Sequence, residues 1–215
     1  MKNIILLAVQ GAGKGTIAAL LKEKYGYVHI STGDILRRRA EIGDDLGLEI
    51  KNLIDRGILV SDDIIFKAIK DHITMSDCDN GYILDGIPRT LSQAIKYDEL
   101  MNELNKDIGV VINLTIPEEI LIKRITSRRI CSSCGKIYST SYKDAKPKIS
   151  GKCDDCKGEL ILRSDDADIK AIEKRINTYH ENAKAMLDFY KKRRILYNID
   201  STDTKKAIRD VEKLI

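Results

Sequence analysis

Short apolar runs alternate with longer amphipathic stretches along most of the chain. Five of these runs are rich in Ile, Leu or Val and are predicted to be strands: residues 3–9, 27–30, 81–85, 109–115 and 195–200. Strands with so little polar character are typical of a parallel sheet that is covered by helices on both faces. The pattern therefore predicts an α/β fold, with a five-stranded parallel sheet flanked by helices.

Helix start signals occur between the predicted strands. Ser61, followed by two aspartates, is a good N-cap. Pro117, followed by two glutamates, opens a helix that is predicted to run to about Arg129. Residues four apart share one face of a helix, so this prediction places Arg124 and Arg128 side by side.

Two stretches interrupt the alternation, a polar helical one at residues 31–60 and a cysteine-bearing one at about 129–164. Both are interpreted as insertions into the sheet domain. The predicted organisation is a core of residues 1–30, 61–126 and 167–215, with insertions at 31–60 and 127–166.

A glycine-rich turn, Gln10-Gly11-Ala12-Gly13-Lys14-Gly15-Thr16, directly follows the first strand and precedes a helix. Glycines let backbone amides turn inward around a phosphate, and the new helix adds its positive end. Lys14 can then reach the β- and γ-phosphates, and Thr16 can approach a Mg²⁺ ion. The alternative is a turn that binds nothing, and the general GxxxxGK[ST] pattern is not fully met, because Ala8 replaces its first glycine and Gly15 follows the lysine.

Composition and charge narrow the function classes. Of the 215 residues, 43% are hydrophobic and 33% charged, and no apolar run is long enough to span a bilayer. No signal-peptide pattern is found either, so we expect a cytoplasmic protein without a membrane partner. A net charge of +4 does not indicate a general nucleic-acid surface.

Four of the five cysteines form two CxxC pairs, Cys131 with Cys134 and Cys153 with Cys156. This spacing is typical of a tetrahedral four-thiolate site, and a closed ligand set indicates a structural Zn²⁺. Iron in the same cage and a zinc ribbon that binds nucleic acid are the alternatives. Cys78 stands apart and is interpreted as an ordinary buried or half-buried thiol.

Three motifs, in order and spacing, resemble the adenylate kinase family: GAGKGT at residues 11–16, STGDILR at 31–37 and LDGIPR at 84–89. With the paired-cysteine insertion, the resemblance covers nearly the whole chain. It implies a P-loop nucleoside monophosphate kinase in which a monophosphate-binding segment and a zinc-bearing lid close over ATP and AMP. It also implies a monomer that needs Mg²⁺ with ATP and does not bind nucleic acid.

The family pattern implies a role for each matching residue. Those implied to contact ATP are Gly11, Ala12, Gly13, Lys14, Gly15, Thr16, Arg124, Arg128, Ile137, Tyr138 and Asp203. Those implied to contact AMP are Thr32, Arg37, Ile58, Leu59, Val60, Gly86, Ile87, Pro88, Arg89, Gln93, Arg163 and Arg175. The implied catalytic set is Lys14, Asp85, Arg89, Arg124, Arg128, Arg163 and Arg175, with Asp85 holding water bound to magnesium.

The residue types fit these roles. Thr32 suits an N-cap, and Arg37, one turn later, offers a planar fork of donors to a phosphate. Phosphoryl transfer mainly requires positioning and neutralisation of charge, so cations are the expected catalytic groups. Gln93 has a second interpretation, because three residues after Thr90 it would complete a capping box.

Two rival functions stay open at this stage, a kinase for UMP, CMP or GMP and a non-catalytic nucleotide-binding or zinc-ribbon protein. Three features also depart from the family pattern. Ala8-Val9-Gln10 precedes the loop where Gly-Ala-Pro is usual, and Ile87 stands where Phe is common. The stretch between Asp166 and Arg175 is one residue longer than is typical of the family, which leaves Lys174 or Lys170 as substitutes for Arg175.

Overall fold

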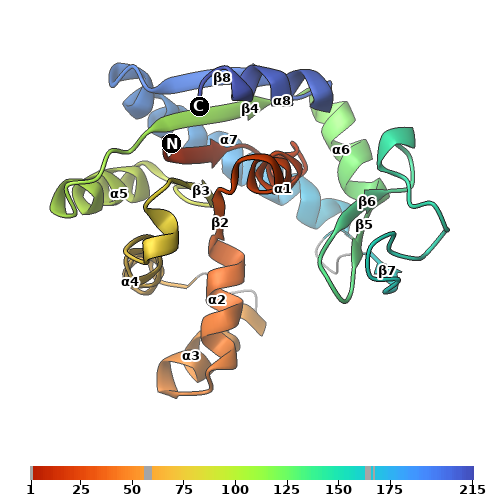
Figure 1. Cartoon of the computed structure of the whole chain (residues 1–215), viewed down its shortest axis with the longest axis horizontal. Helices are drawn as coiled ribbons and strands as arrows, with labels where there is room; N and C mark the ends of the chain where they lie inside the picture. The colour runs from red at the N-terminus through yellow and green to blue at the C-terminus, as the bar shows by residue number, and fades with distance from the viewer. Residues whose placement is uncertain (1, 56–59, 163–165, 167) are drawn as a thin grey trace.

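A computed structural model describes residues 2–55, 60–162, 166 and 168–215 of the chain (Figure 1). The core sheet has five parallel strands in the order β2-β3-β1-β4-β8. They are β1 (Ile4–Leu7), β2 (Val28–Ser31), β3 (Tyr82–Asp85), β4 (Val110–Thr115) and β8 (Leu196–Asp200). The α/β fold and the five predicted strands are thereby confirmed, with bounds that shift by one or two residues.

Alternate side chains of β1 supply two different cores, because successive residues of a strand point to opposite faces of a sheet. Ile4 and Leu6 belong to one buried cluster, whereas Ile5 and Leu7 belong to the other. All four are at most 2% exposed, which explains why the strand reads as a continuous apolar run.

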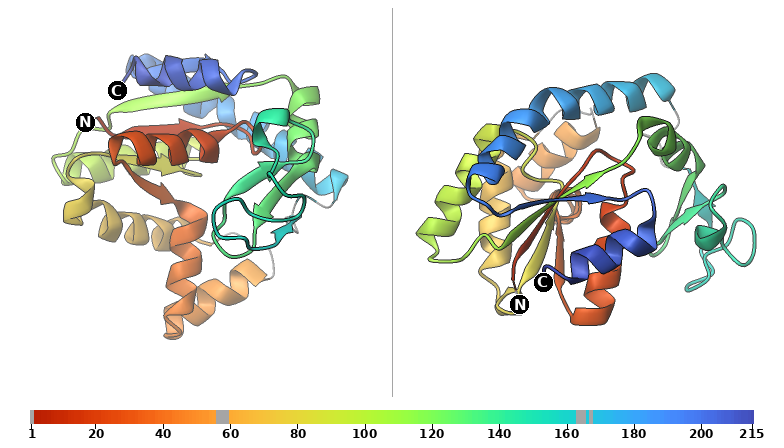
Figure 2. Two further views of the ribbon diagram at one scale, coloured as in Figure 1. Left: turned by 45° about the vertical axis from the view of Figure 1, so that its right-hand side comes forward. Right: turned by 90° about the horizontal axis from the view of Figure 1, so that it is seen from above.

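Helices cover both faces of the sheet (Figures 1 and 2). The first cluster includes residues of α1 (Lys14–Tyr25), α6 (Glu118–Ser127), α8 (Thr204–Glu212) and the first half of α7 (Ile169–Lys192). The second includes residues of α4 (Asp62–Ile73), α5 (Leu91–Glu103) and the second half of α7. The 24-residue α7 therefore runs past the sheet and contributes to both cores.

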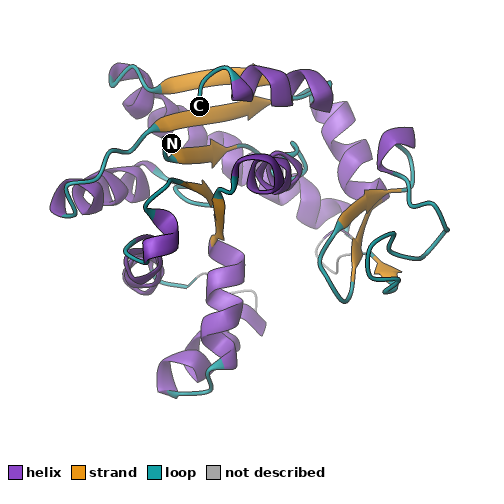
Figure 3. Ribbon diagram, viewed as in Figure 1, coloured by secondary structure: helices purple, strands orange, loops and turns teal. Residues whose placement is uncertain are grey.

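Two smaller units extend from the core (Figures 1 and 3). Helices α2 (Thr32–Glu41) and α3 (Asp45–Asp55) project as an arm with its own small cluster around Leu36, Ile50 and Val60. A three-stranded antiparallel sheet of order β6-β5-β7 carries the cysteines. Its strands are β5 (Arg128–Cys131), β6 (Ile137–Ser139) and β7 (Leu160–Ile161). The chain also forms two short 3-10 helices. One, η1 (Ser76–Cys78), precedes β3, and the other, η2 (Lys143–Ala145), follows β6.

Helix α6 ends two residues earlier than predicted, and this changes the geometry of two arginines. Arg128 has extended backbone angles (φ −67°, ψ 139°) and begins β5 opposite Ser139. The carbonyl of Ser127 accepts a 2.9 Å hydrogen bond from the amide of Thr140. A longer helix would need this carbonyl as an acceptor for its own hydrogen bonds, so the contact with the segment that follows β6 ends the helix here. The prediction that Arg124 and Arg128 share one helix face is wrong.

None of the helices in the described part of the chain has the length and apolar character needed to cross a bilayer.

Candidate active site

The glycine-rich turn connects the end of β1 to the start of α1 in a conformation that glycine permits. Gly11 has φ +92°, and Gly13, the N-cap of α1, has φ +104°. A Cβ at Gly11 would lie 2.5 Å from Cγ1 of Ile125, so α6 packs too closely for any other residue. A glycine N-cap has no side chain to occupy the first-turn amides of α1, which form an anion site together with the helix dipole.

Lys14 lies across this loop. Its Nζ donates hydrogen bonds to the carbonyl oxygens of Ala8 (2.8 Å) and Val9 (3.4 Å). Ala8 itself is buried in the core beside β1, at 8% exposure. The ammonium is thus held next to the backbone that would cradle a polyphosphate.

Two elements border the loop from the side of the cysteine-bearing sheet. Cδ1 of Ile137 lies 3.3 Å from the position of a Cβ at Gly15, and Nη1 of Arg124 lies 3.9 Å from that at Gly13. Arg124 also donates through Nη2 to the carbonyl oxygens of Ser201 and Thr202, both at 2.9 Å. The structure therefore brings Arg124 and Ile137 to the phosphate loop.

Two other predicted ATP contacts have structural partners of their own. Asp203 is the N-cap of α8, where its Oδ1 accepts from the amide of Lys206 at 3.1 Å. Tyr138 is 4% exposed, and its hydroxyl contacts Sγ of Cys153 at 3.4 Å and accepts from the amide of Asp154 at 2.7 Å. Its side chain is buried with Cys131 and Cys153, so only the main chain of Tyr138 is left to make the predicted contact with ATP.

The carboxyl ends of β2 and β3 place the second group of predicted residues. Thr32 is the first residue of α2, not its N-cap, which is Ser31. Its hydroxyl donates instead to the carbonyl of Asp85 at 3.2 Å and so ties the two strand ends together. The carboxylate of Asp85 contacts Nε2 of His29 at 3.4 Å.

Arg89 is held beside Gly86 by a turn that contains a cis Ile87–Pro88 peptide bond. Its Nε donates to the carbonyl of Gly86 at 2.7 Å, and Nη2 lies 3.6 Å from the position of a Cβ at that glycine. Part of the side chain reaches solvent, yet the surrounding protein lowers the pKa of the guanidinium by desolvation, with Asp85 opposing the shift. A cation that is partly desolvated and near a glycine with φ +89° is well placed to meet a phosphate.

Gln93 makes the contacts of a modified capping box at the start of α5. Its amide donates to Oγ1 of Thr90 at 3.2 Å, as the capping-box interpretation predicts. Its Oε1 accepts from the amide of Arg89 at 2.7 Å, one residue before the N-cap, and its Nε2 donates to Asp62 at 2.7 Å. Contact of Gln93 with AMP stays a prediction.

Several predicted residues lie outside this geometry. Ile58, Leu59 and Arg163 fall outside the described residues, as does the side chain of Arg37, whose backbone is part of α2. Of the other predicted contact residues, Val60, Ile87, Pro88 and Ala12 are buried, the last of them within the glycine loop. Thr16 is exposed on α1.

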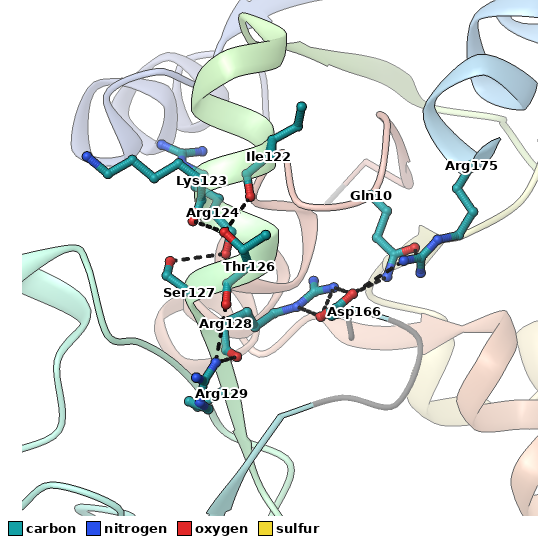
Figure 4. A network of polar contacts seen from close by, with 10 residues as sticks. All are labelled: Gln10, Ile122, Lys123, Arg124, Thr126, Ser127, Arg128, Arg129, Asp166 and Arg175. Carbon is teal, nitrogen blue, oxygen red and sulfur yellow. Dashed lines mark hydrogen bonds and ion pairs between the residues drawn. The ribbon is translucent and has the colours of Figure 1, made fainter. Parts of the chain in front are cut away.

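A chain of polar contacts joins the lid to the phosphate loop (Figure 4). Arg128 donates through Nε and Nη2 to the carboxylate of Asp166, both at 2.8 Å. Arg175 lies on the other side, with Nη2 3.5 Å from Oδ1 of Asp166 and Nη1 2.5 Å from Oε1 of Gln10. The structure thereby brings Arg128 and Arg175 together around one carboxylate, whereas Lys174 and Lys170 are exposed.

Asp166 and Gln10 are the two residues of this network to which sequence reasoning gave no role. Asp166 is one of two adjacent aspartates, at positions 165 and 166, and Gln10 departs from the family pattern before the loop. The two residues are 156 positions apart, so no local spacing signals their contact.

The four paired cysteines form one cluster, with all their Sγ atoms within 4.8 Å of one another. The closest pairs are Cys131 with Cys156 at 3.3 Å and Cys134 with Cys153 at 3.6 Å. A tetrahedral site with metal–sulfur bonds of about 2.3 Å has sulfur atoms about 3.8 Å apart, so the cluster fits a four-thiolate metal ion. The hydrogen bond with Tyr138 and the backbone amides lower the pKa of Cys153 to about 6, which favours the thiolate.

Cys78, by contrast, is 2% exposed, and burial raises the pKa of its thiol to about 11. It is the buried thiol that the sequence predicted.

A glycine loop between a parallel strand and a helix, with Arg124 against the loop and Arg128 and Arg175 around one carboxylate, is the arrangement of a P-loop phosphotransferase. Comparison with known proteins makes the assignment narrower. The family model described as adenylate kinase matches residues 6–195. The chain is 44% identical to an adenylate kinase of Archaeoglobus fulgidus over 214 residues, covering 99% of this chain and 97% of the relative.

Two further relatives agree. An adenylate kinase of Acetivibrio thermocellus is 44% identical over 191 residues, covering 89% of this chain and 87% of the relative. One of Clostridium botulinum is 42% identical over 202 residues, covering 94% and 92%. The chain belongs to the adenylate kinase family.

Proposed function

We propose that this chain catalyses the reversible transfer of the terminal phosphoryl group of ATP to AMP, giving two ADP. Its membership of the adenylate kinase family supports the reaction. The single observation that carries the proposal is the placement of Lys14 and Arg124 on the glycine loop, with Arg128 and Arg175 paired beside it. In the proposal these cations would neutralise the negative charge that a transferred phosphoryl group develops.

In this scheme the loop of residues 11–16 holds the ATP phosphates through backbone amides and the Lys14 ammonium. Arg124 and Ile137 border the ATP side, since both lie against the loop. Arg89, Thr32 and Gly86 form the AMP side at the ends of β2 and β3. The core would comprise residues 1–30, 61–126 and 167–215, and two units, residues 31–60 and 127–166, would close over it. Closure would exclude water, which would otherwise compete with AMP as the acceptor of the phosphoryl group.

Two metal ions belong to the proposal. Mg²⁺, bound with ATP, would neutralise phosphate charge, and Asp85 at the end of β3 would orient its water ligands. Zn²⁺ would be held by the four clustered thiolates in a closed site, where it cross-links the loops of the lid. Thiolate ligands need a reducing compartment, which supports a cytoplasmic location. We also propose that the chain acts as a monomer.

A panel of phosphate acceptors tests the proposal. ATP and Mg²⁺ are offered with AMP, CMP, UMP or GMP in turn, and nucleoside diphosphate formation is followed. The proposal predicts the highest kcat/KM with AMP. A higher value with another monophosphate would replace AMP as the substrate, and no transfer to any of them by folded protein would refute the kinase assignment.

A further inference from the structure

Gln10 is the residue directly before the first glycine of the phosphate loop, and its side chain reaches α7. Its Oε1 accepts the 2.5 Å hydrogen bond from Nη1 of Arg175, across 165 positions of sequence. Its Nε2 donates to Oδ1 of Asp166 at 3.5 Å. One amide therefore contacts both an arginine of the candidate site and the carboxylate beside that arginine (Figure 4).

The contact distances of Gln10 and Asp166 indicate which of the two holds Arg175 more closely. Asp166 is engaged by Arg128 in a two-point pair with distances of 2.7 to 2.8 Å, and its carboxylate lies 3.5 Å from Arg175. The amide oxygen of Gln10 is a full ångström closer to Arg175 than Asp166 is. A hydrogen bond of 2.5 Å is short, whereas a 3.5 Å contact lies beyond the usual hydrogen-bond range, so the Gln10 contact restricts the guanidinium more than the distant carboxylate does.

A neutral amide also preserves the charge of the cluster. Among the described residues of this contact, Arg128 and Arg175 carry two positive charges and Asp166 carries one negative charge, and the amide of Gln10 adds none. An acceptor that carried its own negative charge would hold Arg175 equally well but would cancel the charge that a phosphate needs. An amide at position 10 orients the arginine without this loss.

We infer that Gln10 is a positioning residue, which couples the phosphate loop to the orientation of Arg175. The inference rests on the proposed function, in which Arg175 contacts phosphoryl oxygens. Gln10 itself does not touch the reacting atoms. Because the loop and the arginine are linked by one side chain, binding of a polyphosphate in the loop is transmitted to a cation that enters from a different element.

A double-mutant cycle tests the inference. Gln10→Met removes both polar contacts at nearly constant length, Arg175→Met removes the guanidinium, and the double variant combines them. Loss of a hydrogen bond to a charged group lowers kcat by about tenfold if the bond matters in the transition state, and KM for ATP should change less. In the Arg175→Met background, the same Gln10 change should have an effect of less than about twofold, because its partner is already gone.

The control measurements separate positioning from general damage to the loop. Melting temperature and the dissociation constant for ATP are measured for all four proteins, and Gln10→Ala replaces Gln10→Met if the latter does not fold. Equal fold-changes in kcat in the two backgrounds, or wild-type kcat in the Gln10 variant, would overturn the inference. If the wild-type protein transfers no phosphoryl group, the proposed function fails, and the same cycle in ATP affinity still shows whether Gln10 and Arg175 are coupled.

Discussion

Arg128 and Asp166 form a two-point ion pair in which the carboxylate is completely inaccessible to solvent and the arginine side chain is 12% exposed. The two residues belong to different segments, 38 positions apart. Arg128 is the first residue of β5, and Asp166 precedes α7. The pair therefore links the cysteine-bearing sheet to the start of α7. It also stabilises a buried carboxylate that would be costly without its partners.

Asp166→Asn should reduce the stability of the protein. Removing one member of a buried ion pair costs about 3 kcal/mol or more, because the remaining charge is left without compensation. Urea denaturation of the variant measures this free energy of unfolding. Glu103→Gln is the matched control, since Glu103 pairs with Lys70 at 2.6 Å with side chains 60% and 43% exposed. The control should change stability by less than about 1 kcal/mol, and equal losses in both variants would show that burial of the Asp166 pair contributes nothing.

Arg128→Met should lower kcat by about a hundredfold or more, as expected when a cation that stabilises transition-state charge is removed. Arg129→Met is the control, because Arg129 is the next residue of β5 and its Nη1 donates to backbone carbonyls of Thr126 and Arg128. The kcat values of both variants are measured by steady-state kinetics. The temperature is one at which circular dichroism shows each variant to be folded. Similar activities in the two variants would remove Arg128 from the catalytic set.

Arg175→Met should reduce kcat far more than Lys174→Met. Arg175 faces Gln10 and Asp166, whereas Lys174 is exposed on the adjacent position of α7. The extra residue in the preceding stretch made the two positions hard to distinguish by counting alone. Steady-state rates with ATP and AMP decide the question, and a larger loss in the lysine variant would mean that α7 presents a different residue during catalysis.

Removal of the lid metal should lower the melting temperature without unfolding the core. The clustered thiolates come from loops and short strands whose buried cluster is small, whereas the core has two large apolar clusters of its own. Metal binding therefore supplies much of the free energy that orders the lid. Elemental analysis should find one zinc per chain, chelation should lower the melting temperature, and zinc addition should restore it.

Cys78→Ala is the matched control for the metal experiment and should retain the full metal content, since Cys78 is buried in a core cluster and is not a member of the four-cysteine group. A wild-type protein that contains no metal, or a melting temperature unaffected by chelation, would contradict a structural zinc site.

Sequence patterns predicted most of the core, because buried parallel strands are apolar on both faces and the glycine loop needs backbone angles that glycine alone adopts readily. They failed where tertiary contacts decide local structure. At Arg128 the helix ends because β5 pairs with β6, although the sequence itself has no stop signal there. Thr32 donates across to the end of β3 rather than capping its own helix.

The candidate site shows the same division. The family pattern predicted roles for Lys14, Arg89 and Arg128, but it could not show which carboxylate Arg128 and Arg175 share. Asp166 and Gln10 come into contact with these arginines only in the folded chain, where α7 lies beside the loop. Such long-range polar contacts leave no periodicity in the sequence, so they emerge only from the folded arrangement.

Transfer of a radiolabelled γ-phosphoryl group from ATP to AMP tests the proposed reaction most directly. Metal-loaded protein is mixed with labelled ATP, Mg²⁺ and AMP, and the products are separated after a single turnover. The proposed reaction predicts that the label appears in the β-phosphate of ADP. Label that is released as inorganic phosphate, or that stays in ATP while the folded protein binds both nucleotides, would contradict it.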